Sequence, residues 1–171
     1  MESLAVSTSA LSYLGDLRPA FVAHLADRLS HQIGKESAEL TARAGVMAPE
    51  RTHSVMLFLA AHPPATLAEI ARIDGQPHQL LAARMAPLEH LGLIERTEDP
   101  ADRRRRPYRL TELGKEDAAR IERAAREIAG AMGGLFEEME VDLIAVLDEA
   151  IERLRRVPLV ERCVMEVTAD A

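Results

Sequence analysis

The sequence lacks tryptophan, and two tyrosines and three phenylalanines make up its 3% of aromatic residues. Its core must therefore be built from Ala, Leu, Ile, Val and Met, a set that favours helices. The single cysteine, Cys163, excludes an intrachain disulfide. No apolar run approaches the roughly 20 residues that span a bilayer, and residues 1–10 do not resemble a signal peptide. We therefore expect a mainly helical, cytoplasmic protein that does not interact with membranes.

Catalytic motifs are also missing. The sequence has no Gly-rich phosphate loop, no Ser-centred nucleophile elbow and no Cys/His pair in a catalytic context. His24 and His31 share one face of a predicted helix, but no HxxxH or paired Cys/His spacing accompanies them, which favours a structural or surface role over a metal site. We therefore expect no enzymatic activity, no cofactor and no bound metal.

The net charge of −7 is unevenly distributed. Residues 72–115 contain nine Lys or Arg and seven Asp or Glu, so this stretch carries +2 and the remainder −9. A basic centre between acidic segments can orient a protein on a polyanion.

Apolar residues recur at three- and four-residue steps in several long segments, which predicts amphipathic helices. These segments cover about residues 17–44, 49–61, 112–136 and 141–156. Asp16 is a plausible N-cap for the first helix, and Thr111 can cap the helix that starts at 112. From Ala118 to Leu135 the apolar steps form a heptad seam, which calls for a partner helix. Residues 1–15 are expected to be a frayed arm or a short extra helix, and residues 158–171 are not assigned.

Two short helices are predicted in the middle of the chain. Thr66 and Glu69 fit a capping box at the start of the first, and Gly75 can end it in the left-handed region. Pro77 can open the second, which Gly92 ends. Two short helices joined by a tight, glycine-containing turn predict a helix-turn-helix.

After Gly92 the sequence pattern favours strands. Residues 93–97 and 108–111 predict short strands, and the charged, turn-rich residues 98–107 predict a hairpin tip between them. A helix-turn-helix followed by a hairpin is a winged helix. The predicted fold is mainly α with a small β-hairpin wing. We expect a winged helix-turn-helix domain at 49–111 and a helical dimerisation lobe formed by 1–48 and 112–171.

Three blocks in this region resemble the MarR (multiple antibiotic resistance regulator) family. They are residues 67–71 (LAEIA), residues 88–96 (LEHLGLIER), and residues 99–104 (DPADRR) followed by 110–114 (LTELG). The resemblance implies a homodimer that binds short pseudo-palindromes, with the second helix of each motif in the major groove and the wing toward the minor groove. Many such proteins are repressors released by a small, often aromatic or lipophilic, ligand held between the two lobes.

The residues at these places predict a surface for double-stranded DNA. Consecutive arginines at a hairpin tip exceed what solubility requires and suit phosphates or a narrow minor groove. His78 and Gln79 can contact base edges, or they are ordinary polar residues of a helix start. Arg84 is either a phosphate contact or a half-buried packing residue. The predicted DNA-binding residues are His78, Gln79, Arg84, Arg96, Arg103, Arg104, Arg105 and Arg106.

Four further residues receive narrower interpretations. Asp102 is expected to stabilise the wing by pairing with Arg104, or to be an exposed carboxylate of little consequence. His53 and Met56, one turn apart, are either candidates for an effector pocket or plain packing residues. Cys163 is expected to be an inert thiol.

These observations predict a ligand-responsive transcription regulator, with a repressor as the favoured form, that binds pseudo-palindromic promoter DNA as a homodimer. The alternative is a winged-helix module for protein interaction or dimerisation that no longer reads DNA. The exposed alanines expected in the second short helix and the acidic net charge favour this alternative.

Overall fold

The computed structural model describes residues 11–62, 64–75, 77–98 and 105–169. The chain divides into two compact units, and the boundary falls between Ala125 and Arg126, inside one long helix. The predicted division into a winged-helix domain and a dimerisation lobe concerns function and stays a prediction. Among the described residues, no helix is both long and apolar enough to cross a membrane.

The first unit begins with a 3-10 segment, η1 (Ser12–Phe21), which leads into α1 (Val22–Arg43). The first predicted helix is thus confirmed for most of its length, but its predicted N-cap at Asp16 is wrong, because α1 begins only after η1. Gly15 has φ 52° and ψ −127°, outside the helical region, and Pro19 has no N–H to donate. These two residues prevent a regular α-helix from starting at Asp16.

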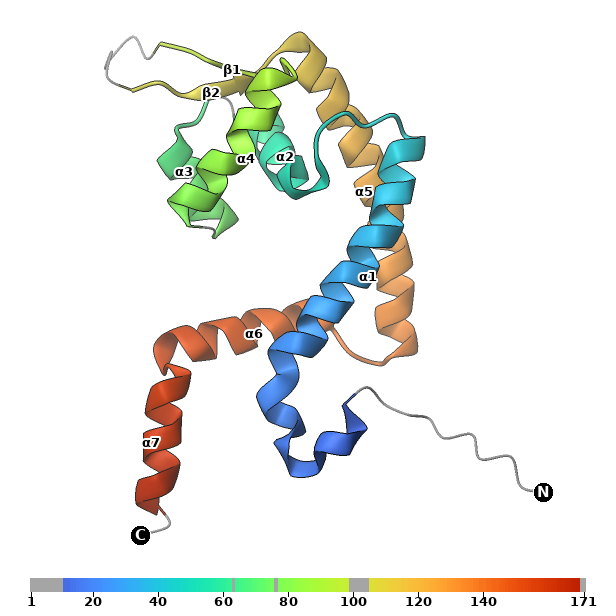
Figure 1. Ribbon diagram of the computed structural model, residues 1–171. Coiled ribbons are helices and arrows are strands. Elements are labelled where there is room, and N and C mark those ends of the chain that lie inside the picture. Colours follow the sequence, from blue (N-terminus) through green and yellow to red (C-terminus); the bar gives the residue numbers. More distant parts are fainter. Residues whose placement is uncertain (1–10, 63, 76, 99–104, 170–171) are drawn as a thin grey trace, which may run out of the picture. The chain divides into compact units, whose positions relative to one another are not determined.

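The winged helix-turn-helix follows α1, and the predicted helix pair and hairpin are both confirmed (Figure 1). Its elements are η2 (Glu50–Thr52), α2 (His53–Ala61), α3 (Leu67–Asp74), α4 (His78–His90), β1 (Ile94–Arg96) and β2 (Tyr108–Leu110). β1 and β2 are antiparallel, with Arg96 opposite Tyr108. Ala65 also pairs with Tyr108 through two backbone hydrogen bonds of 2.9 and 2.7 Å. The start of α3 therefore lies beside the wing.

The core of this unit is aliphatic, as the composition predicted. Every helix and strand from α2 to α5 contributes buried side chains to one cluster. Its largest fully buried members are Met56, Leu59, Ile70, Leu81, Met85, Leu88, Leu93 and Ile121. Burial of each such side chain stabilises the fold by about 1.5–3 kcal/mol. The helix pair and the hairpin are thus packed on one common core.

The long helix α5 (Glu112–Glu138) begins at the base of the wing. The Gly114 N–H donates to the Thr111 hydroxyl at 3.0 Å, which confirms the predicted cap. Ala118 and Ile121, the first residues of the predicted heptad seam, are buried in the chain's own core. Leu135, at the far end of the seam, is 40% exposed. Only the later part of the seam is therefore available to a partner helix.

The second unit contains the end of α5 together with α6 (Leu143–Arg156) and α7 (Leu159–Ala169). Asp142 caps α6 by accepting from the Ala145 N–H at 3.0 Å. At the other end Arg162 donates to the Arg153 and Val157 carbonyls, at 2.9 and 3.0 Å. A cation at a helix C-terminus satisfies carbonyls that have no intrahelical partner.

Candidate nucleic-acid interface

The first helix of the motif begins at a complete capping box. The Glu69 N–H donates to Thr66 Oγ1 at 3.3 Å, while the Thr66 N–H and hydroxyl both donate to Glu69 Oε2 at 2.7 Å. The hydrogen bond from the Thr66 backbone N–H lowers the pKa of Glu69 most, and the one from the Thr66 hydroxyl lowers it further. Gly75 ends the helix at φ 66°, a left-handed conformation that glycine adopts without strain.

The second helix of the motif, α4, has one buried face and one exposed face. Leu81, Met85 and Leu88 are buried, while His78 and Gln79 in the first turn are exposed. The exposed face continues with three small side chains, those of Ala82, Ala83 and Ala86. The helix is unbroken through Pro87. The predicted readout residues His78 and Gln79 are therefore accessible, and small side chains follow them at Ala82, Ala83 and Ala86.

Arg84 differs from its neighbours because it points toward α3. Its Nη1 lies 3.5 Å from Asp74 Oδ2, and the two side chains are only 20% and 16% exposed. Its buried Nε has no hydrogen-bond partner. Of the two interpretations of Arg84, this geometry favours the half-buried packing residue, which links α3 to α4. Its contact with DNA stays a prediction.

The two wing strands are joined by ion pairs and by one cation–π contact. Glu95 and Arg109 face each other across the hairpin and pair at 2.7 Å. Arg96 Nε donates to Glu89 at 2.9 Å, and its guanidinium carbon lies 5.0 Å from the centre of the Tyr108 ring. The hydrogen bond to Glu89 raises the pKa of Arg96, and burial raises the pKa of Tyr108. These contacts stiffen the base of the wing and hold Arg96 in place.

The wing tip is described from Arg105 onward. Arg105 Nη2 lies 2.9 Å from Glu69 Oε1, so the tip is attached to the capping box of α3. Arg106, the next residue, is exposed, and no partner is found for it among the described residues. The predicted contacts at Asp102, Arg103 and Arg104 lie outside the described residues.

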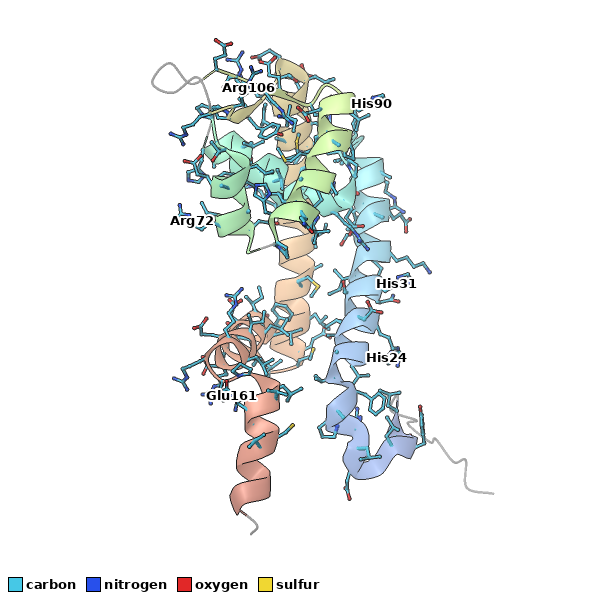
Figure 2. All side chains as sticks on the ribbon, turned by 60° about the vertical axis from the view of Figure 1, so that its left-hand side comes forward. His24, His31, Arg72, His90, Arg106 and Glu161 are labelled. Atoms are coloured by element: carbon cyan, nitrogen blue, oxygen red, sulfur yellow. The ribbon has the colours of Figure 1, made fainter. Side chains whose placement is uncertain are left out.

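Two exposed arginines outline the face on which a polyanion would be bound. Figure 2 shows Arg106 on the hairpin at the top of the winged-helix unit and Arg72 projecting from α3 lower down on the left. Arg72 was not among the predicted contacts, because one arginine on a short amphipathic helix gives no signal beyond solubility. Arg72 lies in the last turn of α3, on the same unit as the wing.

The candidate effector residues do not line the cavity found beside the hairpin. Met56 is fully buried in the core, and His53 is hydrogen-bonded through Nε2 to the Ala48 carbonyl at 3.0 Å. A cavity of about 970 Å³ lies between the end of α2, the outer face of the hairpin and the start of α5. Its lining includes Leu57, Pro64 and Ala119. The pocket at His53 and Met56 therefore stays a prediction.

The remaining candidates are exposed. Figure 2 shows His24 and His31 on α1, two turns apart. In the described part of the chain, no group of three or more His, Cys, Asp or Glu side chains is arranged to hold a metal ion. Cys163 is a free, exposed thiol on α7.

A helix-turn-helix with an accessible second helix, packed beside a hairpin that carries arginines, defines the winged helix-turn-helix class. Residues 49–105 match the model of the MarR family. The match confirms, over these residues, the resemblance seen in the sequence.

Solved structures share the fold over most of the chain. The transcriptional repressor CouR, bound to a 23-mer DNA duplex, superposes with a TM-score of 0.65 at 23% identity, over 80% of this chain and 96% of that chain. For the MepR–DNA complex of S. aureus the TM-score is 0.62 at 19% identity, over 74% of this chain and 96% of that chain. For PcaV of Streptomyces coelicolor with its natural ligand it is 0.59 at 23% identity, over 79% and 92%. No curated protein sequence matches the chain.

Proposed function

We propose that this protein is a transcription regulator that binds duplex DNA as a homodimer and represses the promoter that it occupies until a small effector binds. One observation carries the proposal. In a MarR-family domain, the exposed first turn of α4 lies on the same unit as a wing whose described strands and tip carry Arg96, Arg105, Arg106 and Arg109. This combination supplies a helix for the major groove and cations for the flanking phosphates.

In the proposed complex the wing and α3 supply the sequence-independent attraction. Arg106 and Arg72 are the exposed cations for phosphates, while His78 and Gln79 are placed to contact base edges. The alanines that follow on α4 allow close approach, and a methyl side chain suits contact with a thymine methyl group. Direct readout would thus be concentrated in the first turn of α4.

Exposed apolar side chains support the homodimer. On α6, Ile144, Leu147, Ile151 and Leu154 recur at three- and four-residue steps and are all 45% or more exposed. Contiguous apolar surface of this kind marks an interface in a soluble protein. In the proposed dimer it is buried against a second copy, which sets the two α4 helices about 34 Å apart, one turn of DNA.

The cavity of about 970 Å³ supports the effector response. Its size is that of a site for a drug-sized molecule. Two of its walls are the outer face of the hairpin and the first turns of α5. These walls are the wing itself and the helix that follows it. An effector that binds better to a spacing of the two motifs that does not fit DNA would lower the population of the DNA-binding conformation.

The competing interpretation is a winged-helix module for protein interaction that no longer binds DNA. It is favoured by the alanine-rich face of α4 and by the net charge of −7. A salt titration separates the two interpretations. With a duplex taken from upstream of the protein's own gene, we expect log K to fall linearly with log salt, with a slope of about −0.9 for each phosphate neutralised. Absence of binding at low salt would reject DNA binding.

Arg106→Ala tests the wing contact. Because a dimer carries two copies of Arg106, we expect the variant to bind all duplexes more weakly and to reduce the magnitude of the salt slope by about 2. Arg155→Ala is the matched control, since Arg155 is an exposed arginine of α6 in the second unit. A change in sequence preference without a change in slope would contradict the assignment of Arg106.

A further inference from the structure

An ion pair between described residues joins the wing of this protein to the start of α3. Ala65 and Tyr108 are hydrogen-bonded in antiparallel fashion, so the chain leading into β2 runs past the chain leading into α3. This register brings Arg105, three residues before Tyr108, to Glu69, four residues after Ala65. Their contact, 2.9 Å between Nη2 and Oε1, is therefore a consequence of the strand pairing.

The two oxygens of Glu69 have separate partners. Oε2 accepts both hydrogen bonds from Thr66, and Oε1 accepts from Arg105. Because the Thr66 hydrogen bonds lower the pKa of Glu69, the carboxylate is charged at neutral pH. The capping box thus fixes a negative charge beside Arg105, three residues before β2 begins.

We propose that Glu69 is an internal competitor of DNA phosphate for Arg105, so that the Arg105 guanidinium of the free protein is held by Glu69 and must be released when DNA binds. The inference rests on the proposed DNA-binding function. It assigns to Glu69 a regulatory role, that of setting how strongly the wing attracts any duplex, whatever its sequence.

The geometry favours a Glu69 that competes with DNA phosphate over one that holds the wing in place in the DNA complex. A phosphate that approached Arg105 in its present position would also approach the Glu69 carboxylate, and the two anions would repel each other. The pair is half exposed, 48% for Arg105 and 43% for Glu69, so exchange of one anion for another requires little rearrangement. DNA can therefore displace the contact, but the lost ion pair reduces its affinity.

Glu69→Gln tests the proposal, because glutamine keeps a capping-box residue at this position while removing the charge. The probe is a mixed-sequence 30-base-pair duplex at low salt. We expect the variant to bind it more tightly than wild type by up to about fivefold, the factor that corresponds to an exposed ion pair. An unchanged melting temperature would show that α3 keeps its cap.

Two controls separate release of Arg105 from simple removal of a negative charge. Glu98→Gln removes an exposed wing carboxylate for which no partner is found among the described residues, and we expect less than about a twofold gain. In an Arg105→Ala background, Glu69→Gln should likewise give less than about twofold. Correspondingly, Arg105→Ala should weaken binding more in the Glu69→Gln protein than in wild type.

The outcomes are distinct. Tighter binding by Glu69→Gln that disappears in the Arg105→Ala background supports the competition. Unchanged or weaker binding by Glu69→Gln, or a gain that persists without Arg105, overturns it while leaving DNA binding intact. If the wild-type protein does not bind the duplex at all, the proposed function fails and the competition fails with it.

Discussion

Gly114→Ala is expected to lower the free energy of unfolding by about 3 kcal/mol or more, the upper end of what overpacking costs. A Cβ at this position would lie 1.9 Å from the Leu93 carbonyl oxygen and 2.9 Å from the carbonyl carbon. Both clashing atoms belong to the backbone, so no side chain can rotate away. The first turn of α5 would have to move off the junction between α4 and β1.

That movement is opposed by the contacts that hold the junction together. The Leu93 carbonyl accepts from the Thr111 N–H at 3.0 Å and from the Thr111 hydroxyl at 3.3 Å. The same hydroxyl donates to the Gly92 carbonyl at 2.6 Å and accepts from the Gly114 N–H. Any displacement of Gly114 therefore breaks the α5 cap together with the attachment of the hairpin.

Denaturant unfolding followed by circular dichroism measures the effect, and Gly130→Ala in the same helix is the matched control. Nothing lies within 4 Å of a Cβ built at Gly130, so that substitution should stabilise the helix by up to about 1 kcal/mol. Opposite signs for the two variants are the expected result. If Gly114→Ala were as harmless as Gly130→Ala, the close approach to Leu93 would be wrong.

The sequence predicted those elements whose signals are local. The Thr66–Glu69 box, the left-handed Gly75 and the Thr111 cap each depend on residues within one or two helical turns, and all three are confirmed. The change from helical to strand periodicity after Gly92 likewise located the hairpin.

Features that depend on distant contacts were not predicted. The pair between Arg105 and Glu69 spans 36 residues, and it exists because Ala65 pairs with Tyr108, a single bridge that no periodic pattern announces. For Arg84 the sequence left two interpretations open, and only its packing against Asp74 of α3 favours the half-buried one. Tertiary packing decides such positions, and one sequence alone does not contain it.

Asp117 is the clearest residue that sequence reasoning missed. Its side chain is fully buried, and its two carboxylate oxygens accept from the backbone N–H groups of Met47 and Ala48, each at 2.9 Å. The signal was present, since Asp117 lies four residues before Ile121 and three after Gly114, on the buried face of α5. This carboxylate connects α5 to the turn between α1 and η2.

Asp117→Asn is expected to destabilise the protein by about 3 kcal/mol, because an amide can accept only one of the two hydrogen bonds and turns its NH₂ group toward the other N–H. Hydrogen bonds to a charged group are worth about 1.5–3 kcal/mol each, and the N–H that faces the NH₂ group loses its acceptor. Glu116→Gln, one residue earlier and exposed, is the control and should change the free energy of unfolding by less than about 1 kcal/mol. Equal denaturation midpoints for the two variants would contradict the buried clamp. A loss at Asp117 alone would show that a single buried carboxylate fixes the turn after α1 to the helix that begins at the wing.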